Sequence, residues 1–319
     1  MRTMIHFVFL TLILGWAPQT TAKNAFDPGR SSFEIMCRQE RSAYRIQSVF
    51  FLPGEQATIQ VLSTVADRSY KASLVDGNLA ATGANNWTWT VPREAGYHVI
   101  TIGYGNSDDQ IQLNVFVMEP FSSVKNGALN GFQIGNYPEK PLRNNPIYLP
   151  PRGFVPVTEK MMSLKVSPHF TLGQFICKQA GGFPKYLVLR SRLLFKLEYL
   201  LERVNSQGIQ CESFFVMSGF RTPFYNKAIG NVKYSRHQWG GAADIFVDES
   251  PRDGYPDDLN KDGKINHWDA MVLYELVDGL SSKSEYKPYI GGLGRYRSAP
   301  HRGPFVHVDV RGFKARWGE

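Results

Sequence analysis

The stretch Ser235–Val247 reads SRHQWGGAADIFV, and it determines how the C-terminal half of the chain is organised. Its last residues, Ile245–Val247, are apolar and typical of a strand. The preceding Gly240–Ala243 contains only small side chains, which allow close approach of two backbone segments. We therefore expect the loop that carries His237 to fold back over the strand that carries Asp244.

A second strand is expected at Phe305–Val310, which reads FVHVDV. Side chains alternate between the two faces of a strand, so His307 and Asp309 share one face while the valines occupy the other. His237, Asp244 and His307 together offer two imidazoles and one carboxylate. A catalytic zinc ion uses three such protein ligands and keeps a fourth position for water. A strand histidine between valines is more often a core residue, so the zinc prediction depends on the joint pattern.

The pattern S-x-H-x-x-G-x-A-x-D, followed downstream by V-H-V-D, resembles the zinc D-alanyl-D-alanine carboxypeptidase superfamily of metallopeptidases. It is most similar to the murein endopeptidase K branch, through Gly291–Tyr296 (GGLGRY) and the closing Arg316-Trp317. The resemblance covers residues 167–317, about half of the chain. It implies zinc on His237, Asp244 and His307, an α+β fold with a small antiparallel sheet, and hydrolysis of DD- or LD-peptide bonds in peptidoglycan stem peptides or cross-links.

The resemblance also implies that Arg221, in the segment Ser218–Pro223 (SGFRTP), faces the site and holds a substrate carboxylate or carbonyl oxygen. A planar guanidinium suits this bidentate role, although a surface ion pair is the alternative for such a residue. We place Ser235 beside Arg221 among the substrate-binding residues.

One position departs from the family pattern. Many relatives carry an acidic general base three residues before the last zinc histidine, and here that position is Pro304. Asp309 is therefore our candidate for the base, or for a partner that supports His307. His301 is the second candidate, as an imidazole that steadies an oxyanion or donates a proton. If neither acts, bound zinc alone lowers the pKa of water toward about 7.

A second metal site is predicted at Asp258–Asp269, which reads DLNKDGKINHWD and fits the twelve-residue calcium loop. Gly263 occupies position 6, and an amphipathic helix is expected at Ala270–Leu280, where such a loop ends. We expect calcium to brace the insertion between Asp244 and His307; a solvated acidic turn is the alternative. The expected oxygen donors are Asp258, Asn260, Asp262, the carbonyl of Lys264, Asn266 and Asp269.

Residues 1–22 are typical of a secretory signal peptide. Arg2 precedes an apolar run, and Thr20 and Ala22 provide small residues before a cleavage point. The apolar run is shorter than the roughly 20 residues of a membrane span, and no cysteine follows it for lipid attachment. We expect an exported, most simply periplasmic, protein with no membrane anchor after signal removal.

The remaining chain divides by composition. Residues 23–119 predict a small antiparallel sandwich, an all-β and Ig-like accessory domain, with strands that include Gln56–Leu62 and Gln110–Val117. Residues 120–160 are rich in Pro, Gly and Asn and predict a linker. Residues 161–319 form the expected zinc peptidase domain, with a core-facing helix from the leucine spacing of residues 187–204.

Of the three cysteines, Cys177 and Cys211 flank this helix and form the preferred disulfide pair, with Cys37 left over.

The net charge of +8, or +7 without Arg2, favours anionic partners. Nucleic acid is excluded as a partner by the expected export and by the lack of a recognisable binding motif. The alternative to a peptidase is a non-catalytic cell-wall-binding protein on a zinc peptidase fold. The bond that is cut, exo or endo action and the oligomeric state are left open.

Overall fold

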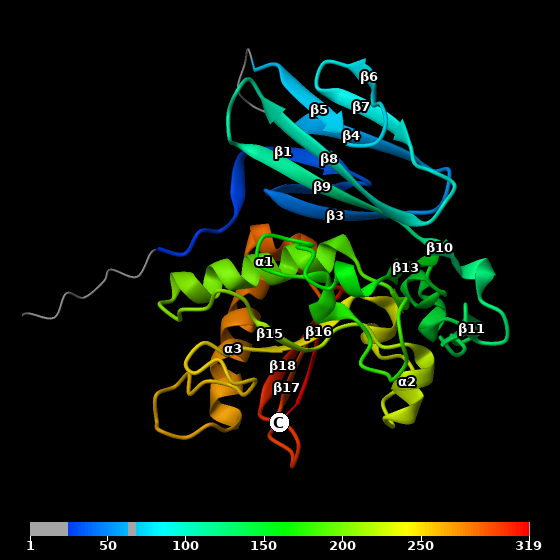
Figure 1. Ribbon diagram of the computed structural model, residues 1–319. Coiled ribbons are helices and arrows are strands. Elements are labelled where there is room, and N and C mark those ends of the chain that lie inside the picture. The colour runs from blue at the N-terminus through cyan, green and yellow to red at the C-terminus, as the bar shows by residue number, and fades with distance from the viewer. Residues whose placement is uncertain (1–24, 63–67, 319) are drawn as a thin grey trace, which may run out of the picture.

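The computed structural model describes residues 25–62 and 68–318 (Figure 1). The expected signal peptide at 1–22 lies outside these described residues. Across the described part of the chain, no helix is both long and apolar enough to cross a membrane.

The first part of the chain is a β-sandwich of two sheets (Figure 1). Buried residues from both sheets, such as Ile35 and Ile59 from one and Ile100 and Leu113 from the other, form one core. Strand β4 shows why: its burial alternates residue by residue, so one face is apolar and covered. The first sheet has the order β2-β1-β4-β7-β6, with β1 (Arg30–Cys37), β2 (Glu40–Tyr44), β4 (Gln56–Leu62), β6 (Ala80–Gly83) and β7 (Asn86–Thr90). The second has the order β3-β9-β8-β5, with β3 (Ile46–Phe51), β5 (Tyr70–Leu74), β8 (Gly96–Tyr104) and β9 (Gln110–Val117).

We had expected an antiparallel sandwich, and one strand pair departs from this prediction. Strand β3 pairs with β9 in parallel, from Ile46 opposite Gln112 to Phe51 opposite Val117. Only Arg45 separates β2 from β3, so the chain passes directly from one sheet to the other. Alternating hydrophobicity predicts a strand and its buried face, but it does not specify the direction of the neighbouring strand.

The predicted linker is a folded part of the core. Ile134, Tyr137, Tyr148 and Phe154 within it are all buried. Proline and glycine keep its elements short without exposing the aromatic side chains between them. The elements are β10 (Glu119–Pro120), η1 (Phe121–Ser123), β11 (Ala128–Leu129), β12 (Phe132–Gln133), η2 (Leu142–Asn144), η3 (Pro146–Tyr148), β13 (Gly153–Val157) and η4 (Glu159–Met161).

The remaining part combines helices with a five-stranded sheet of order β15-β16-β18-β17-β19. All neighbours are antiparallel except β17 and β19. The strands of this sheet are β15 (Phe215–Ser218), β16 (Ala242–Phe246), β17 (Gly292–Tyr296), β18 (Phe305–Asp309) and β19 (Ala315–Trp317). Strand β14 (Lys185–Leu187) lies outside it and pairs with β13. The helices are α1 (Ser191–Ser206), α2 (Pro223–Ala228), α3 (His267–Gly279), η5 (Leu172–Phe175), η6 (Arg236–Trp239), η7 (Leu280–Ser282) and η8 (Ser284–Tyr289).

Helix α1 follows the predicted leucine spacing, except that Leu187 lies in β14. Leu193, Leu197 and Val204 are fully buried, and the helix ends just before Gly208, which has a φ of +80°. Helix α3 packs on the sheet, and its Leu273 belongs to the same hydrophobic core as the valines of β18. The apolar face of β18 is thereby covered, which leaves its other face to present His307.

The disulfide predicted between Cys177 and Cys211 is absent, because both cysteines are free and buried. The Sγ of Cys177 contacts Gln179 Oε1 at 3.6 Å, whereas the backbone of Cys211 is held by the side chain of Asn205. Flanking one helix in sequence does not bring two Cβ atoms to the short distance that a disulfide requires.

Candidate metal centre

His237 lies in the short helix η6, which ends at Gly240 in the left-handed conformation. The turn is fixed from both sides: the amide of Arg221 donates to the His237 carbonyl at 3.3 Å, and Nδ1 of His237 lies 2.6 Å from the carbonyl oxygen of Gly219. A carbonyl can only accept, so Nδ1 carries the proton and Nε2 of the neutral ring presents its lone pair. His237 is only 1% exposed.

Asp244 and His307 are direct partners across the β16–β18 pair. Opposite residues of an antiparallel pair point to the same face of the sheet, so both side chains reach the site that η6 overhangs. As expected, the small residues Ala242 and Ala243 are fully buried between these elements.

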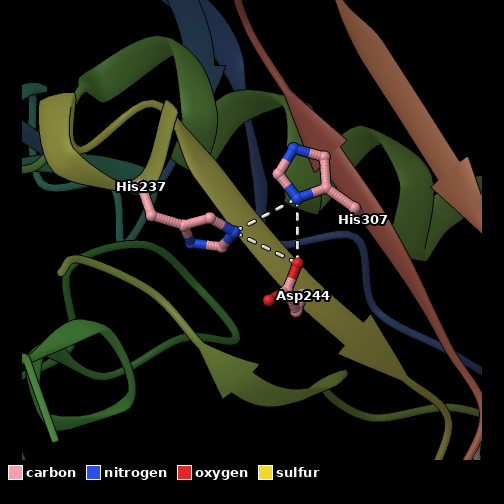
Figure 2. Close-up of side chains that lie close together, drawn as sticks. All are labelled: His237, Asp244 and His307. Atoms are coloured by element: carbon pink, nitrogen blue, oxygen red, sulfur yellow. Dashed lines mark hydrogen bonds and ion pairs between the residues drawn. The ribbon is translucent and has the colours of Figure 1, made fainter. Parts of the chain in front are cut away.

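The three side chains converge on one point, as Figure 2 shows. Nε2 of His237 lies 3.1 Å from Asp244 Oδ1 and 3.1 Å from Nδ1 of His307, and the latter nitrogen lies 2.8 Å from Asp244 Oδ1. Among the described residues, this is the one group of His, Cys, Asp or Glu side chains whose ligand atoms gather closely enough to share a metal ion. Ligand atoms about 2.0–2.1 Å from a tetrahedral zinc stand about 3.3 Å apart. Two edges of the triangle, at 3.1 Å, are near this spacing, and the third, at 2.8 Å, is shorter.

Asp309 supports His307 from behind. Its Oδ2 lies 3.2 Å from Nε2 of His307, and its carboxylate also accepts from the amide of Gly292 and the guanidinium of Arg311. When Nε2 donates to Asp309, the neutral His307 ring turns the lone pair of Nδ1 toward Asp244. Acceptor atoms of all three side chains then face the same point, an arrangement that a cation stabilises.

The pKa values reflect this crowding of buried groups. Burial lowers the pKa of His237, which favours the neutral ring. Burial acts in the same direction on His307, but its hydrogen bonds to Asp244 and Asp309 outweigh it and raise the pKa. For Asp244, burial acts to raise the pKa, yet the adjacent imidazoles hold it well below its ordinary value. Asp244 is therefore ionised, as a metal ligand must be.

Arg221 lies beside the candidate ligands, on the side that the family resemblance implies. Its Nη2 lies 2.5 Å from Asp244 Oδ2, the oxygen that points away from the imidazoles, and its Nε donates to Ser218 Oγ at 2.8 Å. The guanidinium thus orients the carboxylate of Asp244. Ser235 is buried at the start of η6. Contacts of Arg221 and Ser235 with a substrate stay a prediction.

The centre opens into a cavity of about 750 Å³. Aromatic and cationic side chains surround the three candidate ligands, and Asp244 is the one carboxylate among the lining residues that the structure describes. The lining includes Tyr148, Tyr296, Trp317, Arg302 and Arg311. The cavity therefore presents cationic and aromatic groups beside the three candidate ligands.

The two candidate general bases occupy different positions. Asp309 is fully buried and its carboxylate is occupied by His307, Arg311 and Gly292, so its contacts suit a supporting partner better than a base. His301 is exposed in the turn between β17 and β18 and does not line the cavity. Neither side chain faces the point where the three ligand atoms meet.

The predicted calcium loop has the backbone turns of such a loop, but its oxygen donors do not converge on one point. Asp258 accepts from the amides of Asp262 and Gly263, and Asp262 accepts from the amide of Lys264. Asp269 instead accepts from the amides of Leu259, Asn260 and Asn266. Within the described chain, Asp258, Asp262 and Asp269 do not gather their ligand atoms as the histidine cluster does.

Two supporting contacts were not predicted. Arg311 holds Asp309 with two nitrogens, and the ring of Trp317 lies 5.1 Å from that of His307. Arg311 could have been found by extending the alternation of β18 by one step, because residues 307, 309 and 311 share a face. The contact between the Gly219 carbonyl and His237 could not have been predicted, because a backbone group makes it and the residue type at position 219 gives no indication of it.

No family model and no curated protein matches the chain. Several solved structures are similar to a part of it, and they include the following two. The crystal structure of the titin M3 domain aligns at 10% identity over 27% of this chain and 98% of that chain, with a TM-score of 0.18. The crystal structure of domains 4 and 5 of the S-layer protein SbsC aligns at 16% identity over 27% of this chain and 53% of that chain, with a TM-score of 0.15. Neither similarity is informative about function.

Proposed function

We propose that the protein is an exported, zinc-dependent peptidase that hydrolyses DD- or LD-peptide bonds in peptidoglycan stem peptides or cross-links. The observation that carries this proposal is the convergence of His237 Nε2, His307 Nδ1 and Asp244 Oδ1 at the base of an open cavity. The chemistry of that donor set suits zinc with a free position. The motif resemblance supplies the substrate class, and residues 161–319 would be the α+β catalytic domain.

Bound zinc would polarise the scissile carbonyl and activate water. The chain's own residues prepare the site for this chemistry. Gly219 and Asp309 fix the two imidazoles in the tautomers that present lone pairs to the metal. Arg221 holds Asp244 in place, and its position at the cavity wall would let the guanidinium also contact a substrate oxygen.

The test combines metal content with digestion. His237→Ala and His307→Ala should each strip zinc from the purified protein and abolish the release of muropeptides from isolated sacculi, because two ligands hold zinc far less tightly than three. His98→Ala, a histidine substitution within the sandwich strand β8, is the matched control and should retain both properties. Full digestion by either ligand variant would refute the proposal. The masses of the released muropeptides would identify the bond.

A non-catalytic wall-binding protein is the second candidate. It is favoured by Pro304 at the family's general-base position and by the lack of a further carboxylate among the described residues that line the cavity. If this candidate holds, zinc-loaded protein should sediment with sacculi in a saturable way while releasing no muropeptide on long incubation.

We also propose that Asp258–Asp269 binds calcium and braces the sheet. Support comes from the left-handed Lys261 and Gly263, which give the loop the turn that its sequence predicts. Leu259 of the loop lines one small pocket together with Phe246 of β16 and Phe305 of β18, the two strands that carry Asp244 and His307.

Calcium at millimolar concentration should raise the melting temperature of the wild-type protein by several degrees, because an ion that binds only the folded state stabilises it. Asp258→Asn should lose this increase, whereas Asp76→Asn, in an exposed turn of the sandwich, should keep it. Calorimetry that detects no calcium binding at millimolar levels would contradict the proposal.

A further inference from the structure

A second cavity, of about 860 Å³, adjoins the cavity of the metal centre. The two cavities share three lining residues, Asn231, Lys233 and Tyr234, so the segment 231–234 forms a wall between them. The other walls of the second cavity come from residues 136–140 and from helix α2, which begins directly after Arg221 and Thr222. A chain lying across the shared wall would therefore extend from the metal centre into the second cavity.

The shared wall is held in place by hydrogen bonds to its backbone. The Nδ2 of Asn226 donates to the carbonyls of Asn231 and Val232 at 3.4 and 3.0 Å, and Gln238 Nε2 donates to the Lys233 carbonyl at 2.9 Å. The hydroxyl of Tyr234 then bonds to the carbonyl of Lys140 on the opposite wall, at 3.1 Å. The second cavity is thus a formed feature of the fold.

The chemistry of the second cavity is cationic. Lys140, Lys227 and Lys233 line it, and Glu139 is the one acidic side chain among its lining residues. All three lysines are exposed, and none of them takes part in an ion pair that we observe among the described residues. The ammonium of Lys233 lies 5.6 Å from the centre of the Tyr234 ring, and none of the ion pairs observed among the described residues has to break for the lysines to meet an anionic ligand. The exposed amide of Asn136 adds a neutral donor and acceptor.

We propose that the second cavity binds a carboxylate-bearing arm of the peptide whose scissile bond lies at the metal centre. The inference rests on the proposed function, and it adds a subsite that selects substrates by charge. Three lysines around one cavity attract an acidic peptide arm, and the wall that this cavity shares with the cavity of the metal centre connects the two sites. A neutral peptide would gain nothing from the lysines.

The experiment measures binding and cleavage by the full-length, zinc-loaded protein. The variant is Lys140→Gln/Lys227→Gln, which removes two lysines that line only the second cavity. The matched control is Lys71→Gln/Lys160→Gln, which removes the same charge at exposed positions outside both cavities. The ligands are a soluble murein tetrapeptide with free carboxylates and the same peptide with its carboxylates amidated. Calorimetry gives the Kd, and product release gives kcat and KM.

The first variant should weaken binding of the free tetrapeptide by about threefold to tenfold, as two exposed charge contacts would, and should leave binding of the amidated peptide unchanged. The KM should rise by a similar factor while kcat stays the same. The difference from wild type should shrink at high salt, because exposed charges are screened. The control should behave as wild type.

Equal affinity of the variant and its control for the free tetrapeptide would overturn the inference, as would a wild-type protein that binds neither peptide. Two further outcomes separate this inference from the proposed function. If the protein cleaves the peptide and the KM is the same for wild type and for Lys140→Gln/Lys227→Gln, the proposed peptidase function is supported and the proposed subsite is refuted. Lysine-dependent binding without any cleavage by wild type would sustain the subsite and refute the peptidase.

Discussion

Asp309 lies behind His307, on the side away from the cavity, and this position allows it to orient the imidazole. Its pKa is held well below the ordinary value, because the hydrogen bonds from His307 and Arg311 outweigh the effect of burial, which acts to raise it. A carboxylate that stays ionised and enclosed orients an imidazole and strengthens it as a donor. We therefore expect Asp309 to act through His307.

Asp309→Asn should weaken zinc affinity by about 10- to 100-fold, the usual effect of losing such a partner, because an amide orients the ring less strongly. Competition with a zinc-binding dye measures the change. With zinc in excess, activity should recover to a large extent. If Asp309 were instead the general base, kcat would fall at saturating zinc while the affinity for zinc stayed near that of wild type.

Part of this site could be predicted from residue identity and alternation alone. The pattern of β18 placed His307 and Asp309 on one face, which the structure confirms through their 3.2 Å contact. It did not tell whether Asp309 faces the cavity or the protein interior, because that depends on the backbone amide of Gly292 and the side chain of Arg311. The direction of a side chain on one face of a strand depends on its tertiary contacts, which the pattern of the strand alone does not contain.

At the scale of the element, the turn of η6 depends on Gly240. Its φ is +61°, and a Cβ there would collide with the carbonyl of Val188. Gly240→Ala should therefore cost more than the roughly 1–2 kcal/mol of a left-handed alanine and should also weaken zinc binding, because the turn positions His237. Gly230→Ala is the matched control, since it has a φ of +66° but open space around it. Urea unfolding and zinc titration of both variants measure the effects; equal losses would contradict this account.

Helix α1 carries a buried lysine that makes stability depend on pH. Burial lowers the pKa of Lys196 to about 7, although its Nζ donates to the Asp309 carbonyl at 2.8 Å and lies near the ring of Tyr286. The charge of Asp309 raises this pKa, and those of Arg316 and Arg311 lower it further. The unfolded chain binds the proton more tightly than the folded one between pH 7 and the ordinary lysine pKa.

Stability should therefore rise with pH through that window, by about 1.4 kcal/mol per unit from Lys196, and should not change on this account below pH 7. The free energy of unfolding of wild type minus that of Lys196→Met, measured in urea from pH 6 to 9.5, isolates the contribution from other titrating groups. Parallel curves for the two proteins would show that Lys196 keeps its ordinary pKa when folded.

Two strands were predictable to the residue, whereas β18 ends at Asp309, one residue before the predicted end. Strands β4 and β9 begin and end where the sequence indicated, because each has one buried and one covered or solvated face with clear turn residues outside. The prediction that residues 120–160 form a linker was wrong for a physical reason. The prolines of this segment do limit regular structure, but they say nothing about Tyr137 and Phe154, whose burial depends on surfaces formed elsewhere.

At the scale of the whole molecule, the sandwich and the second part share a polar contact in addition to apolar packing. Asn114 of β9 is fully buried and donates to the Lys165 carbonyl at 2.9 Å, while Ser48 of β3 donates to the Val166 carbonyl at 2.7 Å. Phe116 of β9 belongs to the core of the second part. The two parts should therefore unfold together.

Asn114→Ala tests this coupling. The substitution leaves the Lys165 carbonyl without this donor and should cost about 1–3 kcal/mol at the contact between the two parts. Calorimetry should show one transition for wild type and a broadened or divided transition for the variant. Asn86→Ala is the control and should keep one transition, because the Asn86 side-chain amide donates to the carbonyl of Ala84 within the sandwich itself. Two transitions in wild type would show that the contact carries little free energy.

The pairing of Asp244 with His307 across β16 and β18 has a consequence for timing. A slip of one residue would place a valine opposite Asp244, so only the correct alignment completes the ligand triangle. The proposed metal binding would therefore require residue 307 to have paired with β16 in the correct alignment. A chain that ends before residue 307 would lack one of the three proposed ligands and, with it, the proposed activity.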